Sequence, residues 1–210
     1  MTNSKFDQLE KAFFHDGYQL AINALKNTTN HTVPDAVIKE MYAIIDGLID
    51  SLFAYARQQN QAIECKKGCA WCCHQPVFAL DYELNYLNNF IHKNFDIVTR
   101  SAIQKKAKFK REKLAQLEGD ALLNAKTPCP LLHEGACLVY EARPMACRIY
   151  LSSDVKSCKL FFNNPDDKSN YPKLLDMPMR LGRMMNEGFK SALKTNGVEA
   201  KEYRIEEKLC

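Results

Sequence analysis

Four cysteines occupy nine consecutive positions in the stretch IECKKGCAWCCHQPV. Cys65, Cys69 and Cys72 are spaced i, i+4 and i+7, and Cys73 follows directly. On a helix this spacing would place the sulfur atoms on one face, and in a loop they could converge as easily. Thiolates are soft ligands, and a site built from four of them selects zinc or an iron–sulfur cluster. The stretch therefore predicts a metal or cluster site.

A second set of four cysteines follows later in the chain. Cys129, Cys137, Cys147 and Cys158 are separated by gaps that are typical of ligands delivered by a hairpin and a helix. Cys129 precedes Pro130, and the same Cys-Pro pairing occurs beside iron–sulfur ligands in bacterial ferredoxins. We expect this second set to contribute ligands together with the first.

Two arginines flank one cysteine of the second set. Arg143 precedes Cys147 by four residues, and Arg148 follows it directly. Four thiolates around one zinc ion, or around an oxidised 4Fe–4S core, leave about two negative charges. A nearby guanidinium can offset part of this charge and donate hydrogen bonds to sulfur. Arg143 and Arg148 are therefore predicted to interact with the bound group.

Other interpretations of these residues remain open. A single cysteine such as Cys158, or Cys210 at the end of the chain, can be a small buried hydrophobe without a chemical role. His74 and His133 could each replace a sulfur ligand in a zinc site, although packed or solvated histidines are the simpler interpretation. The spacing does not separate zinc from iron. Eight sulfurs suffice for one site with spare redox-active thiols or for two sites.

The two cysteine segments resemble those of the YkgJ-like cysteine-cluster proteins, a family described as zinc- or iron-chelating and often labelled as iron–sulfur-cluster-containing. The resemblance rests on CKKGCAWCCHQPV, on CPLLHEGACLVYEARPMACR and on their order, and it covers about residues 60–150. It implies ligation by the seven cysteines of these two phrases, with Cys158 outside them. Flagellin lysine methylases, which are considerably longer, share the same cysteine region. The resemblance thus also implies, less directly, a protein-modifying enzyme.

Helical patterns precede the first cysteine segment and continue after it. Apolar residues recur at helical spacing before the polar NTTNHT stretch, residues 27–32, and a wider apolar stripe runs from Val37 to Leu52. A short helix is predicted from Asp81, with Glu83 also in its first turn, where acidic residues meet the helix dipole. Another helix is predicted from Asp96 to Gly119. It carries an apolar stripe on one side and lysines mostly on the others.

The second cysteine segment predicts a small hairpin followed by helices. The apolar pieces CPLL and ACLVYE flank the turn-like HEG, and Pro144 suits the first turn of a short helix that contains Cys147. A last helix is predicted over about residues 177–195, ending at Asn196-Gly197. We therefore expect a mainly α protein, with a single domain over 1–210 and a cysteine-rich core over about 60–160.

The composition and the lack of an export signal predict that the cysteines are in a reducing environment. The chain has 210 residues, of which 46% are hydrophobic and 10% aromatic, as in an ordinary globular domain. We see no secretory signal and no membrane-spanning run, so we expect a cytoplasmic protein in which cysteines bind metal or react rather than form disulfides. The basic segment 105–113 contains one aromatic residue and fits a solvated helix face better than a nucleic-acid site.

Three functions follow as alternatives. The favoured one is a 4Fe–4S protein with a redox, sensing or accessory role, with zinc as the alternative metal. The second is an interaction module that a zinc ion staples and that binds a protein partner. The third is an enzyme that modifies protein side chains, for which the sequence offers no Gly-rich loop after a strand. The sequence leaves open whether the chain is an enzyme and what its oligomeric state is.

Overall fold

The computed structural model describes residues 3–26 and 32–209 of the chain. Most of the predicted break at 27–32 and the terminal Cys210 lie outside these residues. Helices dominate the described part, which confirms the predicted mainly α class. The helices are α1 (Asn3–Lys26), α2 (Asp35–Gln58), α3 (Asp81–Asn94), α4 (Ile97–Leu114), α5 (Gly119–Asn124), α6 (Met145–Ile149), α7 (Val155–Asn163), α8 (Asp176–Thr195) and α9 (Ile205–Lys208).

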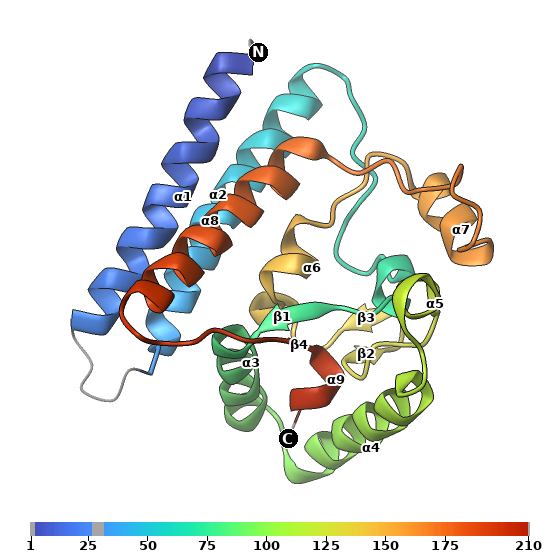
Figure 1. Ribbon diagram of the computed structural model, residues 1–210. Helices are drawn as coiled ribbons and strands as arrows, with labels where there is room; N and C mark the ends of the chain where they lie inside the picture. Colours follow the sequence, from blue (N-terminus) through green and yellow to red (C-terminus); the bar gives the residue numbers. More distant parts are fainter. Residues whose placement is uncertain (1–2, 27–31, 210) are drawn as a thin grey trace.

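Helices from the two ends of the chain pack side by side. Figure 1 shows α1, α2 and α8 as one group, with α8 lying along α1. Their apolar stripes face inward, and Met41, Met185 and Phe189 are fully buried in one hydrophobic cluster. Met145 and Ile149 of α6 join the same cluster. Burial of this stripe explains why the sequence forms these helices, and it fixes the position of α6.

Two glycines allow α1 and α8 to approach closely. A Cβ atom built on Gly188 of α8 would lie 1.9 Å from the carbonyl oxygen of Phe14 in α1. A Cβ atom on Gly17 of α1 would lie 2.0 Å from the carbonyl oxygen of Met185 in α8. Each glycine thus faces the backbone of the opposite helix, which cannot move aside as a side chain could.

We expect Gly188→Ala to destabilise the protein by about 1–3 kcal/mol, because the added methyl group forces α1 and α8 apart. Gly47 in α2 is the matched control, since a Cβ atom there meets no atom within 4 Å. Gly47→Ala should raise the free energy of unfolding by about 1 kcal/mol through its helix propensity. Urea denaturation of both variants checks this, and equal effects of the two substitutions would contradict it.

A second hydrophobic cluster lies beside the cysteines. Leu84, Leu87 and Ile91 of α3 pack there with Ile103 of α4 and Ile205 of α9. The strands among the described residues are short and form two antiparallel pairs, β1 with β4 and β2 with β3. They are β1 (Phe78–Leu80), β2 (Leu132–His133), β3 (Ala136–Cys137) and β4 (Glu202–Arg204).

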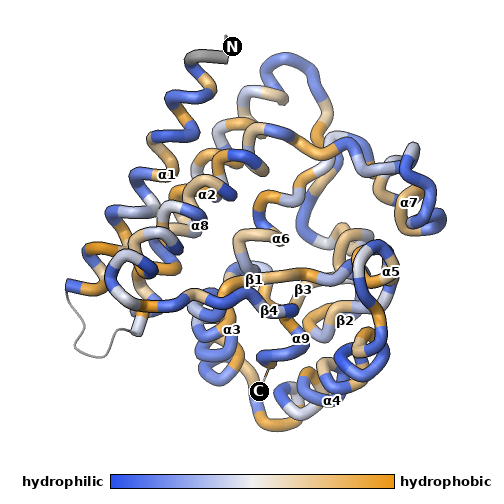
Figure 2. Tube along the Cα trace, viewed as in Figure 1, coloured by the Kyte–Doolittle hydropathy of each residue, from blue (hydrophilic) through white to orange (hydrophobic). Residues whose placement is uncertain are grey.

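The pairing of β1 with β4 brings the end of the chain back to the first cysteine segment. Phe78 pairs with Arg204, and Leu80 pairs with Glu202. In Figure 1 this pair lies between the α1, α2 and α8 group and helix α4. Figure 2 shows hydrophobic residues along β1 and α6, and mainly hydrophilic residues on much of α4. The strand pair therefore joins the C-terminal segment to the residues that follow the first cysteine segment.

Several boundaries differ from the sequence-based expectations. Helix α4 ends at Leu114 rather than at Gly119, since Leu114 is its last buried residue, and Gly119 instead begins the short helix α5. The last long helix, α8, ends at Thr195 as predicted, with Gly197 at a φ of +75°. No helix within residues 3–26 and 32–209 has the length and apolar character needed to cross a membrane.

Candidate metal centre

The first cysteine segment forms a loop and one turn of 3-10 helix. Cys65 and Cys69 lie in the loop, and Cys72 and Cys73 lie in the 3-10 turn Trp71–His74. Gly68 adopts a φ of +91°, which favours glycine and reverses the chain between the first two cysteines. A loop followed by a 3-10 turn, and not a continuous helix, thus presents these four sulfurs.

The predicted hairpin carries Cys137 of the second set, and Cys129 lies just before it. Leu132 pairs with Cys137, and the turn residues Glu134 and Gly135 have φ angles of +48° and +76°. Two successive positive φ angles are those of the tight turns that close two-residue hairpins. Cys129, just before the hairpin, donates its backbone N–H to the carbonyl oxygen of Cys73 at 2.7 Å. This bond joins the two cysteine segments directly.

The buried carboxylate of Glu83 holds the helix that carries Cys147. Its Oε1 accepts from the hydroxyl of Tyr42 at 2.9 Å and from the backbone N–H of Met145, the first residue of α6, at 2.7 Å. Its Oε2 accepts from the N–H of Leu80 at 3.1 Å and from the amide of Asn186 at 3.4 Å. One side chain thus joins α2, α3, α6 and α8. Its burial raises the pKa of Glu83.

We expect Glu83→Gln to destabilise the fold by about 1–3 kcal/mol. All four partners of Glu83 are hydrogen-bond donors, and the NH2 group of a glutamine would face two of them without being able to accept a hydrogen bond. Chemical denaturation measures the change. Glu187→Gln is the control, since Glu187 lies on the exposed side of α8. The interpretation would be wrong if both variants were as stable as the wild type.

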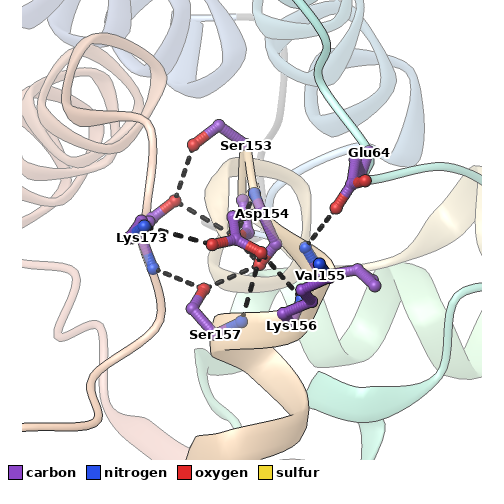
Figure 3. A network of polar contacts seen from close by, with 8 residues as sticks. Glu64, Ser153, Asp154, Val155, Lys156, Ser157 and Lys173 are labelled. Carbon is purple, nitrogen blue, oxygen red and sulfur yellow. Dashed lines mark hydrogen bonds and ion pairs between the residues drawn. The ribbon is translucent and has the colours of Figure 1, made fainter.

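Cys158 lies on α7, which a polar network holds against the first cysteine loop (Figure 3). Asp154 caps α7 by accepting from the N–H of Lys156 at 2.8 Å, and it pairs with the ammonium of Lys173 at 3.2 Å. Glu64, adjacent to Cys65, accepts from the N–H of Val155 at 2.7 Å. These bonds bring the beginning of α7 to the beginning of the cysteine loop.

The thiols fall into two sets according to which of them influence one another electrostatically. Cys73, Cys129, Cys137 and Cys147 form the first set, the hairpin group. Burial raises the pKa of Cys147 well above its ordinary value, and negative charge on the three other members would raise it further. Burial likewise raises the pKa of Cys129 to about 12 and raises that of Cys137. Cys129, Cys137 and Cys147 all pack against the second hydrophobic cluster.

Cys65, Cys69 and Cys158 form the second set, the loop group. Burial raises the pKa values of Cys65 and Cys158, and negative charge on Cys69 would raise both further. Cys72 lies between the two sets, since its pKa responds to Cys147 and to Cys65. It donates a hydrogen bond to Cys73, which raises the pKa of Cys72 and lowers that of Cys73.

The cysteine sulfur atoms lie in one region of the fold, but they are not yet arranged around a single metal position. Within residues 3–26 and 32–209, no three His, Cys, Asp or Glu side chains are placed around a common metal position. Burial raises the pKa of Cys65, Cys129, Cys137, Cys147 and Cys158 and so favours their protonated form. Coordination therefore requires that cysteine side chains rotate and lose their protons as the metal binds.

A lysine that the sequence pattern predicts to be solvated is buried beside the hairpin group. Lys110 of α4 is 2% exposed, and its Nζ donates to the carbonyl oxygen of Gln75 at 3.1 Å. None of the described carboxylates forms an ion pair with it. Its positive charge acts on Cys73 and Cys129 and favours their thiolates. Residues 103, 107, 110 and 114 share one helix face. The position of Lys110 within this apolar stripe was the sequence signal for its burial.

The two arginines have different surroundings. The guanidinium of Arg143 lies 3.8 Å from the ring centre of Tyr140 and acts on three thiols of the hairpin group and on Cys65. Its Nε is buried and has no hydrogen-bond partner among the described residues. Arg148 instead pairs with Asp46 of α2 and donates from Nε to the carbonyl oxygen of Arg143 at 2.9 Å. Arg148 thereby joins α6 to α2.

The two histidines near the cysteines have other contacts. His74 packs edge-to-face on Phe162 at 5.0 Å between ring centres, and its Nδ1 lies 3.1 Å from the carbonyl oxygen of Ala70. His133 is 56% exposed and lies near Glu134. These placements describe a packed and a solvated histidine.

Comparison with protein families gives one match. The family named CxxCxxCC, described as a "putative zinc- or iron-chelating domain", matches residues 64–174, which is more than half of the chain. The name spells two residues between the first two cysteines, whereas this chain has three between Cys65 and Cys69, including Gly68. No curated protein and no solved structure gives a significant match.

Proposed function

We propose that this chain, which belongs to the CxxCxxCC family of zinc- or iron-chelating domains, uses its cysteine-ligated metal site to hold a 4Fe–4S cluster with a redox, sensing or accessory role. Cysteine-ligated metal binding is the property of the family. The choice of an iron–sulfur cluster and the role of the site are the proposal. Cys73, Cys129, Cys137 and Cys147 are the proposed ligands of this cluster.

The observation that carries the proposal is the buried ammonium of Lys110 next to a group of four thiols. A buried charge without a partner is costly, and it is tolerated when an opposite charge lies nearby. Four thiolates around a 4Fe–4S core, and equally around one zinc ion, leave about two negative charges, which would supply that partner. The orphaned Nε of Arg143 fits the same group, because guanidinium N–H groups donate to cluster sulfur.

The surrounding residues prepare the site for a redox role. An iron–sulfur cluster accepts and returns one electron, and the charges and hydrogen bonds around its sulfurs set the potential. Lys110 and Arg143 would stabilise the more negative, reduced state. Arg148 supports Arg143 through the hydrogen bond to its carbonyl oxygen. Apolar side chains such as Leu131 and Val139 exclude water from this side of the hairpin.

Metal and acid-labile sulfide analysis of protein purified without air tests the proposal. We expect iron and sulfide in equal amounts, a brown colour, and visible absorption that dithionite bleaches. Colourless protein with stoichiometric zinc and no sulfide would overturn the iron–sulfur proposal while leaving metal binding by cysteines intact.

Zinc is the second candidate, and the number of cysteines in the hairpin group favours it. Four cysteines that act on one another satisfy one tetrahedral zinc ion without additional sulfide. In that case the metal would staple the hairpin and α6 to the first cysteine loop, and chelation should unfold this region. Cys65, Cys69, Cys72 and Cys158 would remain for a second site or as redox-active thiols.

A further inference from the structure

A large cavity opens next to the cysteine region and is not part of the hairpin group. Its volume is about 980 Å³, and it lies between α2, α3 and the loop that carries Cys65. Cys65 lines the cavity, so the cavity touches the loop group at one edge. A cavity of this size and position fits the usual dimensions of a site for a small organic molecule.

Two cations meet at the edge of the cavity beside Cys65. The Nζ of Lys67 lies 5.3 Å, and the guanidinium of Arg143 lies 3.8 Å, from the ring centre of Tyr140. All three residues line the cavity. Neither cation forms an ion pair with a carboxylate among the described residues. The charge of Lys67 is therefore available to a ligand, and the charge of Arg143 is shared between the ligand and the neighbouring thiols.

The cavity as a whole favours negative charge. Among the described residues, seven basic and four acidic side chains line it. Arg148 and Asp46 pair with each other, which leaves six basic and three acidic side chains. Walls with an excess of one charge raise the local concentration of ligands with the opposite charge.

The remaining surface of the cavity is apolar. Phe53 and Ile49 of α2 and Tyr86 and Phe90 of α3 contribute rings and aliphatic groups to its walls. Such surfaces bind the body of an organic ligand, while a few polar groups fix its orientation. An inorganic anion would leave these side chains without a contact.

We propose that this cavity binds a small organic anion, whose apolar body lies along Tyr86 and Phe90 and whose carboxylate or phosphate lies between Lys67 and Arg143, next to Cys65. The inference goes beyond metal binding and applies equally to zinc and to an iron–sulfur cluster. It gives the metal region a neighbouring site for a substrate or an effector.

Calorimetry with a matched set of probes tests the class of ligand. Phenyl phosphate and phenylacetate combine an apolar ring with an anion, benzyl alcohol lacks the charge, benzylamine reverses it, and inorganic phosphate lacks the ring. We expect the two aromatic anions to bind at least about tenfold more tightly than the other three, as expected for the loss of one charge-assisted hydrogen bond or of the apolar contact. Comparison of the two shows whether phosphate or carboxylate is preferred. Equal binding of the neutral ring, preference for benzylamine, or no binding of either anion at millimolar concentration would overturn the proposal.

Two variants place the binding in this cavity. Ala43→Trp should abolish binding by filling the cavity from the exposed side of α2. Lys67→Ala should weaken the binding of the two aromatic anions without changing the binding of benzyl alcohol. Lys194→Ala, at the exposed end of α8, is the matched control and should leave binding unchanged. Metal content is measured on every variant, so that a lost metal site is distinguished from a lost ligand site. Unchanged phenyl phosphate binding in Ala43→Trp would contradict the assignment.

Discussion

Replacing Cys147 with serine is expected to remove metal and stability together. Cys147 lies on α6 and belongs to the hairpin group, and negative charge on each of the three other thiols would raise its pKa. Serine offers a hard hydroxyl that is not deprotonated at neutral pH and does not replace a thiolate. We expect a loss of at least about 3 kcal/mol of unfolding free energy, given that structural zinc sites contribute roughly 10–16 kcal/mol.

Metal analysis and denaturation of the same preparations measure both effects. Ala146→Ser is the matched control, since Ala146 is the exposed neighbour of Cys147 on α6. The metal content of the parallel variant Cys69→Ser shows whether the chain holds one metal site or two. Loss of about half of the metal would indicate that the loop group holds a separate site, and complete loss would indicate one shared site. Full metal content in both cysteine variants would contradict the ligand assignment.

Substituting methionine for Lys110 is expected to change stability with opposite signs in the two states of the protein. In the metal-free protein, methionine removes a buried charge that has no carboxylate partner, so the variant should be more stable than the wild type. In the metal-loaded protein, the same change removes the cation that offsets the thiolate charge. The loaded variant should be destabilised by up to about 3–5 kcal/mol, the range for breaking a buried ion pair.

Denaturation with and without a chelator measures the change in unfolding free energy in the metal-free and the metal-loaded protein. Lys105→Met is the matched control, because Lys105 lies on the exposed side of the same helix. In an iron–sulfur protein, Lys110→Met should also lower the reduction potential, because the reduced cluster loses a stabilising positive charge. A stability change of the same sign with and without metal would show that Lys110 does not respond to charge in the site.

The elements with strong local patterns could be predicted from the sequence. The wide apolar stripe of α8 and its glycine stop give the correct helix, and HEG between two apolar pieces gives the correct hairpin turn. The cysteine pattern identified the family, because the order and spacing of ligands are local properties of the chain. The assignment of individual cysteines to a site remains a prediction.

Features that depend on distant contacts could not be predicted. Strands β1 and β4 each have three residues, too few to show a pattern, and they pair across more than a hundred residues. The four donors around Glu83 come from four different segments, so its sequence position indicates only a helix cap. Arg148 follows a cysteine in sequence, yet its guanidinium turns toward Asp46 of α2 because α6 packs against that helix.

Lys110 illustrates a signal that is visible in the sequence but easy to misread. One lysine of a lysine-rich helix shares the face of Ile103, Ala107 and Leu114. Amphipathic helices often carry basic residues at the border of the apolar face, where long side chains reach water. Only the tertiary structure distinguishes such a border residue from a lysine that is enclosed next to thiols.

The position of α6 limits how far this chain can be shortened. The segment matched by the family, residues 64–174, includes α6 but lacks α1, α2 and α8. An excised fragment would expose Met145 and Ile149 to water, and Glu83 would lose the hydroxyl of Tyr42 and the amide of Asn186. Expression of the isolated cysteine module should therefore yield aggregates. The flanking helices act as an obligatory scaffold, and any minimised version must keep them or supply a surrogate apolar surface.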